Sequence, residues 1–109
     1  MRFILLTLLI LCVAAEPTCD CACDYQELGR GTWSLLHEMV KETPTERLQA
    51  SFVSFMWSLA DLYPCGECRG HLTEYLYNHP PVLDPTWVCE LHNDVNRRLG
   101  KDQQPCWDI

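Results

Sequence analysis

The sequence is poor in basic residues. Eight lysines and arginines stand against 15 aspartates and glutamates among 109 residues, so the formal net charge is -7. Proteins that bind nucleic acid need clustered lysine and arginine to contact the phosphates, and we therefore expect no nucleic-acid partner. The alternation of polar and apolar residues that is typical of β-strands is also missing. The length fits one domain, and the predicted fold class is all-α.

Long apolar runs are absent as well. The run from Phe3 to Val13 has eleven residues, well short of the roughly 20 that a membrane-spanning helix needs. It follows Met1-Arg2 and leads into two small residues, so residues 1–15 are predicted to be a secretory signal peptide cleaved before Glu16. The alternative is an uncleaved anchor. We expect no stable membrane span after cleavage, and a location in the endoplasmic reticulum lumen or outside the cell.

Cysteine, by contrast, is abundant. The sequence has eight cysteines, and removal of residues 1–15 would leave seven of them in a chain of 94. Cysteines in a small secreted domain usually form disulfides that support a limited core. An odd number leaves one thiol free or bonded to another chain. Residues 16–25 show no helical periodicity and are predicted to be a flexible arm that carries Cys19, Cys21 and Cys23.

Apolar residues spaced by three and four predict two helices in the first half of the domain. The first covers about residues 26–41. The second runs to about Leu62, and its start signal is Thr43 as N-cap, Pro44 at the first helical position and Glu46 completing a capping box.

Two further helices are predicted after a second proline signal. The third opens at the motif Tyr63-Pro64-Cys65-Gly66-Glu67-Cys68 and ends before Pro80-Pro81. The fourth starts with Asp84 as N-cap and ends at Gly100, which is typical of a C-terminal cap. Short loops between four helices predict an antiparallel four-helix bundle with a short C-terminal turn.

The pair Cys65 and Cys68 is the first candidate for chemistry. Pro64 suits the first position of a helix, which places both thiols in its first turn. Unpaired N–H groups and the positive end of the helix dipole stabilise a thiolate there, so the pair can act as a reversible dithiol and disulfide. The same spacing also occurs in metal sites and structural disulfides.

The fourth helix carries an unusual polar group in its middle. His92, Asn93 and Asn96 are three and four residues apart and share one face, and asparagine is a poor helix former. This pattern suggests a bound polar ligand, and a solvent-exposed face is the alternative. A disulfide between Cys89 and Cys106 would hold the tail against this helix and contribute about 3 kcal/mol.

Three stretches in this order resemble the Erv/ALR family of FAD-dependent sulfhydryl oxidases. They are Leu28-Gly29-Arg30-Gly31-Thr32-Trp33-Ser34-Leu35-Leu36-His37, the motif around Cys65 and Cys68, and Cys89-Glu90-Leu91-His92-Asn93-Asp94-Val95-Asn96 followed by Leu99-Gly100-Lys101 and Cys106. The resemblance implies a disulfide-stapled helical bundle that binds FAD over residues 26–109, usually as a homodimer. It also implies oxidation of protein thiols, a thioredoxin-like oxidoreductase being one such partner, with electrons passing through FAD to molecular oxygen to give hydrogen peroxide.

The resemblance also implies roles for individual residues. Cys65 and Cys68 are the catalytic pair, with Cys68 facing the flavin and Cys65 exchanging with incoming thiols. Cys89 and Cys106 form a structural disulfide, and Cys19, Cys21 and Cys23 are candidates for a shuttle that relays electrons inward. The residues implied to bind FAD are Arg30, Trp33, His37, Tyr63, Cys89, His92, Asn93, Val95, Asn96, Leu99 and Lys101.

Two other functions fit parts of the pattern. Cys65, Cys68, Cys89 and His92 supply the ligands of a Cys3His zinc module, although thiols in a secreted protein tend to oxidise. A disulfide-stapled interaction protein without chemistry is the second alternative. We expect no metal. A yellow colour of the purified protein separates the flavoprotein from both alternatives.

Overall fold

The structure, a computed structural model, describes residues 24–106, and all of their regular structure is helical. The helices are α2 (Tyr25–Met39), α3 (Glu46–Leu62), α4 (Gly66–Asn78) and α5 (Pro85–Leu99). The predicted signal peptide and the cysteines of the predicted arm lie outside the described residues. Among the described residues, no helix combines the length and apolar character needed to cross a membrane.

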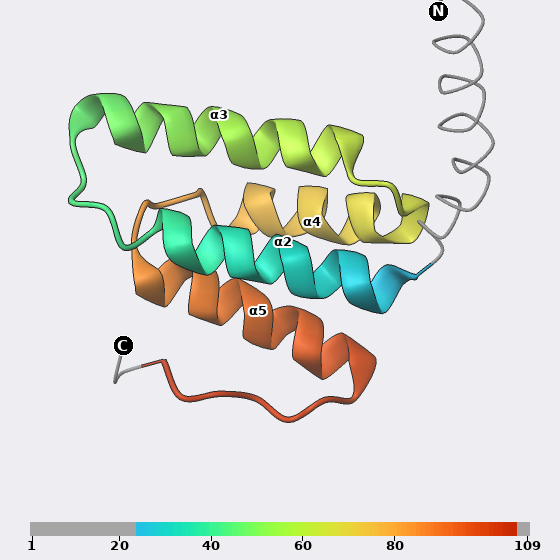
Figure 1. The fold of residues 1–109 in the computed structure, drawn as a ribbon. Coiled ribbons are helices and arrows are strands. Elements are labelled where there is room, and N and C mark those ends of the chain that lie inside the picture. The colour runs from blue at the N-terminus through green and yellow to red at the C-terminus, as the bar shows by residue number, and fades with distance from the viewer. Residues whose placement is uncertain (1–23, 107–109) are drawn as a thin grey trace, which may run out of the picture. The chain divides into compact units, whose positions relative to one another are not determined.

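The chain divides into two parts between Gly31 and Thr32, inside α2. In the first part, the described residues 24–31 form the start of α2, where the Asp24 carboxylate accepts a hydrogen bond from the Glu27 N–H at 3.0 Å. The second part contains the rest of α2 and the three other helices. From Thr32 onward, consecutive helices run in opposite directions (Figure 1), which confirms the predicted antiparallel arrangement.

Each helix from α3 to α5 begins at a side-chain cap. Thr45 Oγ1 accepts the Leu48 N–H at 3.1 Å, and the Asp84 carboxylate accepts the Thr86 N–H at 3.0 Å. Gly100 ends α5 with a left-handed φ of 70°, a conformation that glycine adopts without steric cost. The predicted start of the fourth helix and its glycine cap are therefore confirmed.

Two predicted helix starts are wrong. The N-cap of α3 is Thr45 and not Thr43, so Pro44 precedes the helix instead of occupying its first position. Likewise Pro64 lies before α4, whose N-cap is Cys65. In both places proline is one residue before the cap, where its fixed φ shapes the entry into the helix without supplying a helical residue.

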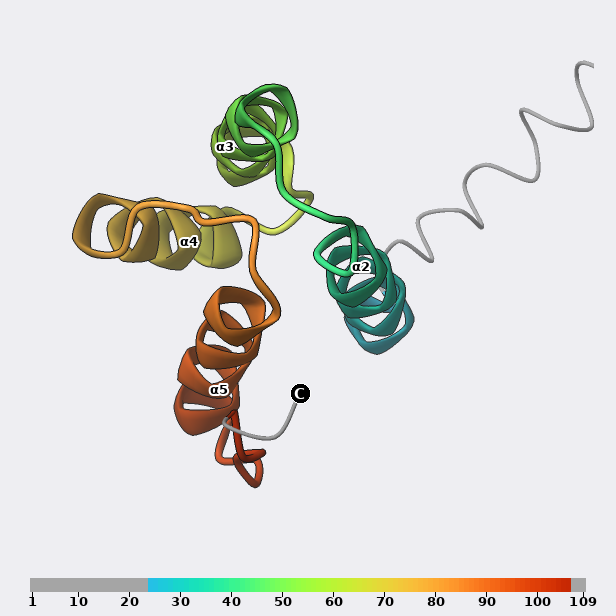
Figure 2. The same cartoon turned by 90° about the vertical axis from the view of Figure 1, so that its left-hand side faces the viewer.

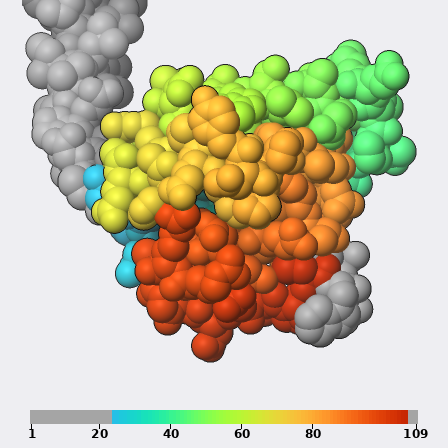
Figure 3. All heavy atoms as spheres, turned by 180° about the vertical axis from the view of Figure 1, so that it is seen from behind, coloured from blue at the N-terminus to red at the C-terminus, as the bar shows by residue number. Residues whose placement is uncertain are grey.

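The core lies in the second part of the chain, and every helix contributes to it. Met56 of α3 and Val88 of α5 are completely buried. The view along the helices shows α3, α4 and α5 side by side in that order (Figure 2), and α4 separates α3 from α5 on the face shown in Figure 3. The buried apolar residues are Leu36, Val40, Phe52, Met56, Ala60, Tyr75, Leu76, Leu83, Trp87, Val88 and Leu91.

The loop between α4 and α5 is held by a glutamine from α3. The Gln49 side chain donates from Nε2 to the Pro81 carbonyl at 2.9 Å and accepts the Leu83 N–H at 2.7 Å. Pro81 and Leu83 are both buried, so these hydrogen bonds satisfy backbone groups that are shielded from water. This contact fixes the position at which α5 begins.

Candidate functional site

A disulfide between Cys65 and Cys68 closes the start of α4. Cys65 is the N-cap, and its Sγ accepts a hydrogen bond from the Cys68 N–H at 3.2 Å. The sequence placed both cysteines in the first helical turn, which is correct for Cys68 and one position too far for Cys65. The predicted stabilisation of a thiolate at Cys65 still applies, because an N-cap side chain also faces the unpaired N–H groups of the first turn.

The two sulfur-bearing residues differ in exposure. Cys68 is exposed and Cys65 is half-buried. Thiol–disulfide exchange requires an attacking thiolate to reach a disulfide sulfur, and this disulfide offers such access. The resemblance assigns the outer, substrate-facing role to Cys65 and the flavin-facing role to Cys68, whereas in the structure Cys68 is the more exposed of the two. The assignment stays a prediction from the resemblance.

Tyr63, just before the disulfide, is held at both ends. Its carbonyl accepts the Cys65 N–H at 2.7 Å and Nη1 of Arg69 at 2.6 Å. Its hydroxyl accepts a hydrogen bond from Thr32 Oγ1 of α2 at 3.3 Å. Sequence reasoning missed Thr32 and Arg69. Thr32 stands inside the first stretch that carries the resemblance, and Arg69 directly follows the second, which was the available signal.

A ring cluster joins α2 to α5. The Trp33 indole stacks on the His92 imidazole with ring centroids 3.9 Å apart and planes 10° from parallel. His37 Nε2 and His92 Nδ1 share a hydrogen bond of 3.1 Å. The structure thus brings together three residues that the resemblance assigned to cofactor binding, although His37 and His92 are 55 positions apart in the sequence.

The two histidines favour their neutral forms. Burial lowers the pKa of His37 below its usual 6.5, and the charge of Lys41 lowers it further. Burial also lowers the pKa of His92, with smaller effects from His37 and Lys101. A neutral pair can form the observed hydrogen bond with one ring donating and the other accepting, whereas two imidazolium rings could not.

Asn93 and Asn96 have different environments on α5. The Asn93 amide donates to the Gln104 carbonyl at 2.6 Å, and its oxygen accepts the Gln104 N–H at 2.8 Å. Asn93 therefore holds the C-terminal tail. Asn96 is also buried, but its side-chain amide forms no hydrogen bond with any of the described residues 24–106. Among the described residues, the buried side-chain nitrogen without a hydrogen-bond partner is Nε1 of Trp87 and not the Asn96 amide, so the Asn96 amide keeps contact with solvent and can bond to a ligand.

A second disulfide joins Cys89 of α5 to Cys106 in the tail. Cys89 is 6% exposed, so this bond is less accessible than the one at the start of α4. Both predicted pairings are present. Cys65 and Cys68 are bonded to each other and Cys89 is bonded to Cys106, so these three cysteines are not thiolate ligands of a Cys3His zinc site in this structure.

The other residues implied to bind the cofactor are more exposed to solvent. Val95 is half-buried, Leu99 is 62% exposed, and Lys101 is an exposed cation just after the α5 cap. Arg30 is in the first part of the chain, where it pairs with Glu27 at 3.5 Å. Cys19, Cys21 and Cys23 lie outside the described residues.

The residues present fit a flavin dinucleotide. Flat rings from α2 and α5 offer surfaces for stacking, the Asn96 amide offers hydrogen bonds, and Lys101 offers a positive charge for a pyrophosphate. The Cys65–Cys68 disulfide adds a group that can be reduced and reoxidised. Together they match the chemistry of a site that exchanges electrons between thiols and a flavin.

Known proteins resemble this chain in sequence. Residues 30–109 match the model of the Erv1 / Alr family. The mitochondrial FAD-linked sulfhydryl oxidase erv1 of Schizosaccharomyces pombe is 39% identical over 93 residues, covering 76% of this chain and 51% of the relative. The FAD-linked sulfhydryl oxidase ERV2 of Saccharomyces cerevisiae is 32% identical over 92 residues, covering 77% and 47%. The chain thus spans about half the length of the curated relatives it matches.

A solved structure agrees with the fold. The crystal structure of the FAD binding domain of Erv1 from Saccharomyces cerevisiae superposes with a TM-score of 0.68 at 32% identity, and the match covers 76% of this chain and 87% of that one. Residues 30–109, which the family model matches, include both disulfides and the ring cluster of α2 and α5. The chain therefore belongs to the Erv1/Alr family.

Proposed function

We propose that this protein is an FAD-linked sulfhydryl oxidase, which forms disulfides in protein thiols and passes the electrons through FAD to oxygen to give hydrogen peroxide. The observation that carries the proposal is the Cys65–Cys68 disulfide, which caps α4 with Cys68 exposed. It occurs in a chain whose relatives are named FAD-linked sulfhydryl oxidases.

The two cysteines at the start of α4 carry out the thiol chemistry. A substrate thiolate attacks Cys65 Sγ, which breaks the Cys65–Cys68 bond and leaves Cys68 as a thiolate. The second substrate thiolate then attacks the substrate sulfur that is bonded to Cys65. The substrate disulfide forms, and Cys65 leaves as a thiolate. Two electrons move to the enzyme pair, and the two protons go to solvent. FAD, when bound, supplies the acceptor that reoxidises the pair.

The residues that would hold FAD come from three segments. Trp33, His37 and His92 provide the ring surfaces, and Asn96 and Lys101 provide the amide and the positive charge. Tyr63 would keep its place beside the disulfide through its contacts at the carbonyl and the hydroxyl. We include the remaining residues named from the sequence, Arg30, Cys89, Asn93, Val95 and Leu99, in this proposed set.

The test is an absorption spectrum followed by a dithiol assay. The purified protein should be yellow, consume oxygen and release peroxide when dithiothreitol is added. The Cys65→Ser and Cys68→Ser variants should retain flavin and lose turnover, while the exposed Ser54→Ala variant of α3 should match the wild type. A colourless protein, or turnover that survives loss of Cys68, would overturn the proposal.

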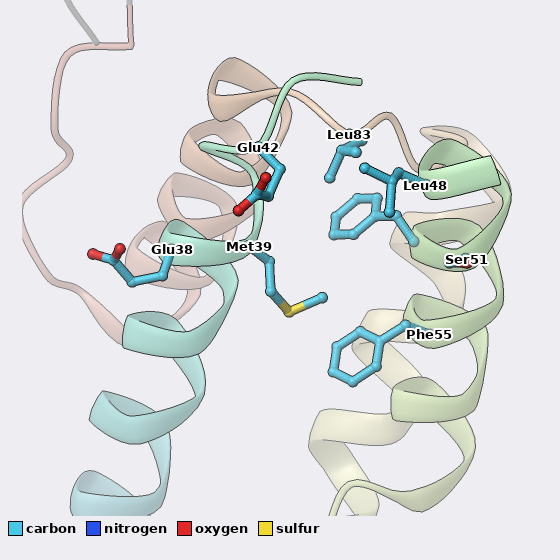
Figure 4. A pocket seen from close by; sticks show the side chains of 8 residues that line it. Glu38, Met39, Glu42, Leu48, Ser51, Phe55 and Leu83 are labelled. Atoms are coloured by element: carbon cyan, nitrogen blue, oxygen red, sulfur yellow. The ribbon is translucent and has the colours of Figure 1, made fainter. Parts of the chain in front are cut away.

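We also propose a homodimer, with a second copy of this chain covering the face made by the end of α2 and by α3. A pocket of about 530 Å³ opens there, and Figure 4 shows Met39, Leu48 and Phe55 directed into it. Glu38 and Glu42 line the same pocket, and Arg47 lines a neighbouring one, so two copies can place opposite charges together.

The measurement for the dimer is sedimentation velocity. Phe55→Glu should shift the protein from dimer to monomer, because it buries a charge in an apolar contact. Tyr77→Glu is the matched control, since Tyr77 is 75% exposed on α4. A dimer that survives Phe55→Glu would contradict this location of the interface.

Two further proposals concern residues outside the described range. We propose that residues 1–15 direct the chain into the secretory pathway. A test is needed because the relatives include a mitochondrial protein, and N-terminal sequencing of the mature protein provides it. We propose that Cys19, Cys21 and Cys23 relay electrons from protein substrates. Changing all three to serine should preserve oxidation of dithiothreitol and greatly slow oxidation of a reduced protein; equal rates on the protein would remove the idea.

A further inference from the structure

We propose that Arg69 is a positioning residue for the Cys65–Cys68 pair, in an inference that rests on the proposed function. Its guanidinium holds the turn that carries Cys65 and places a fixed positive charge beside the pair, so that the pair is reduced more readily. Arg69 is half-buried in the first turn of α4.

The contacts of Arg69 lie on both sides of Cys65. Nη1 donates to the carbonyl of Tyr63, two residues before Cys65, at 2.6 Å. Nη2 lies 3.5 Å from the position that a Cβ would take on Gly66, the residue directly after Cys65. The Arg69 N–H also donates to the Cys65 carbonyl at 2.9 Å. The side chain therefore spans the turn from Tyr63 to Gly66 and is not free in solvent.

Arg69 is the only arginine or lysine in residues 48–96. The other charged residues closest to the pair in the sequence are acidic, Asp61 at the end of α3 and Glu67 in the first turn of α4. From α2, the contact that reaches this turn is the neutral hydroxyl of Thr32 on the ionisable Tyr63. Within residues 24–106, no side chain of α5 forms a hydrogen bond or ion pair with residues 63–69. Arg69 thus balances carboxylates that would otherwise disfavour a thiolate.

The effect follows from the exchange reaction. When a substrate thiolate breaks the Cys65–Cys68 bond, negative charge appears on Cys68, and when the substrate disulfide forms, it appears on Cys65. A nearby cation stabilises both anions but not the neutral disulfide. It therefore shifts the equilibrium toward the reduced pair and makes Cys65 a better leaving group. Since Arg69 is partly solvated, we expect a factor of about three to ten and not the larger effect of a buried charge.

The experiment compares the wild type with Arg69→Met, which removes the charge, and Arg69→Lys, which keeps it without the planar fork. Arg97→Met is the matched control, because Arg97 is an exposed arginine of α5 that pairs with Asp94 and has no part in the proposed cofactor site or dimer face. Each holoenzyme is equilibrated with glutathione buffers without oxygen. The thiols are then alkylated, and the oxidised fraction of the Cys65–Cys68 peptide is measured by mass spectrometry. The alkylation rate of the reduced pair is also measured against pH.

Arg69→Met should lower the equilibrium constant for reduction about three- to tenfold and move the alkylation profile to higher pH. Arg69→Lys should keep most of the wild-type value, and Arg97→Met should equal the wild type. An unchanged constant in Arg69→Met, even with a lower melting temperature, would overturn the proposal, as would equal losses in the Met and Lys variants. The measurement needs no turnover. Failure of the wild type to oxidise dithiols would therefore reject the proposed function without changing the result for Arg69.

Discussion

The disulfide between Cys89 and Cys106 should stabilise the fold without taking part in turnover. The two cysteines are 17 positions apart, so in the loop-entropy account their bond stabilises the folded chain by about 3 kcal/mol. The double variant Cys89→Ala/Cys106→Ala should lose about this amount of unfolding free energy. It should also bind FAD more weakly, because Cys89 stands one turn before His92, within the proposed cofactor site.

The tail should nevertheless stay docked in this variant, because Asn93 holds it independently. Asn93 forms two hydrogen bonds with the Gln104 backbone, each worth about 1 kcal/mol. Adding Asn93→Ala to the double variant should therefore cost about 2 kcal/mol more and release the tail to proteolysis. Asn93→Ala alone should have the smaller effect on proteolysis, since the disulfide still holds the tail.

The assay is urea unfolding followed by circular dichroism at one fixed FAD concentration, because bound ligand adds to the apparent stability. Dithiol oxidation is measured with FAD in excess and should persist in the double variant. A variant that retains its flavin and cannot turn over would refute the structural role. An unchanged unfolding free energy would refute the loop-entropy estimate.

Three further outcomes follow from contacts in the second part of the chain. Because burial lowers the pKa of His37 and His92 below the 6.5 of the unfolded chain, stability should fall as pH drops below about 6.5, and replacing both with Asn should flatten that profile in thermal melts. Gln49→Leu should cost about 2–3 kcal/mol in urea unfolding, since it leaves the buried Leu83 N–H without a partner. Met56→Ala should cost about 2–5 kcal/mol, because Met56 is fully buried, and a cost below 1 kcal/mol would show that the core closes over the cavity.

Local signals in the sequence were sufficient to predict α5. Asp84 is typical of an N-cap and Gly100 is typical of a C-cap. The structure places both where the sequence predicts them. The start of α3 was not determined locally, because Thr43 and Thr45 can both act as caps and both stand near Pro44. The structure uses Thr45, whose hydroxyl accepts the Leu48 N–H.

Contacts between distant segments could be predicted only through the family resemblance, or not at all. The resemblance grouped Trp33, His37 and His92, but the hydrogen bond between the two imidazoles depends on how α2 meets α5. The contact of Arg69 with the Tyr63 carbonyl depends on the path of the chain around Pro64. Propensity and periodicity describe single helices and carry no information about such contacts.

The two disulfides of the described residues can serve different roles, because the folded structure gives each one a different environment. Exchange begins when a thiolate reaches one sulfur of the bond along its axis, so an accessible disulfide reacts and a shielded one does not. Cys68 is exposed at the start of α4, whereas Cys89 is buried on α5 and its partner lies in a tail that Asn93 holds in place. When the pair in α4 is reduced, the Cys65 cap and the Arg69 contact can still hold the helix start, so we expect the fold to tolerate loss of that bond. Reduction of the other would free the tail from one of its two attachments. We therefore expect the difference in burial to separate the exchangeable disulfide from the structural one.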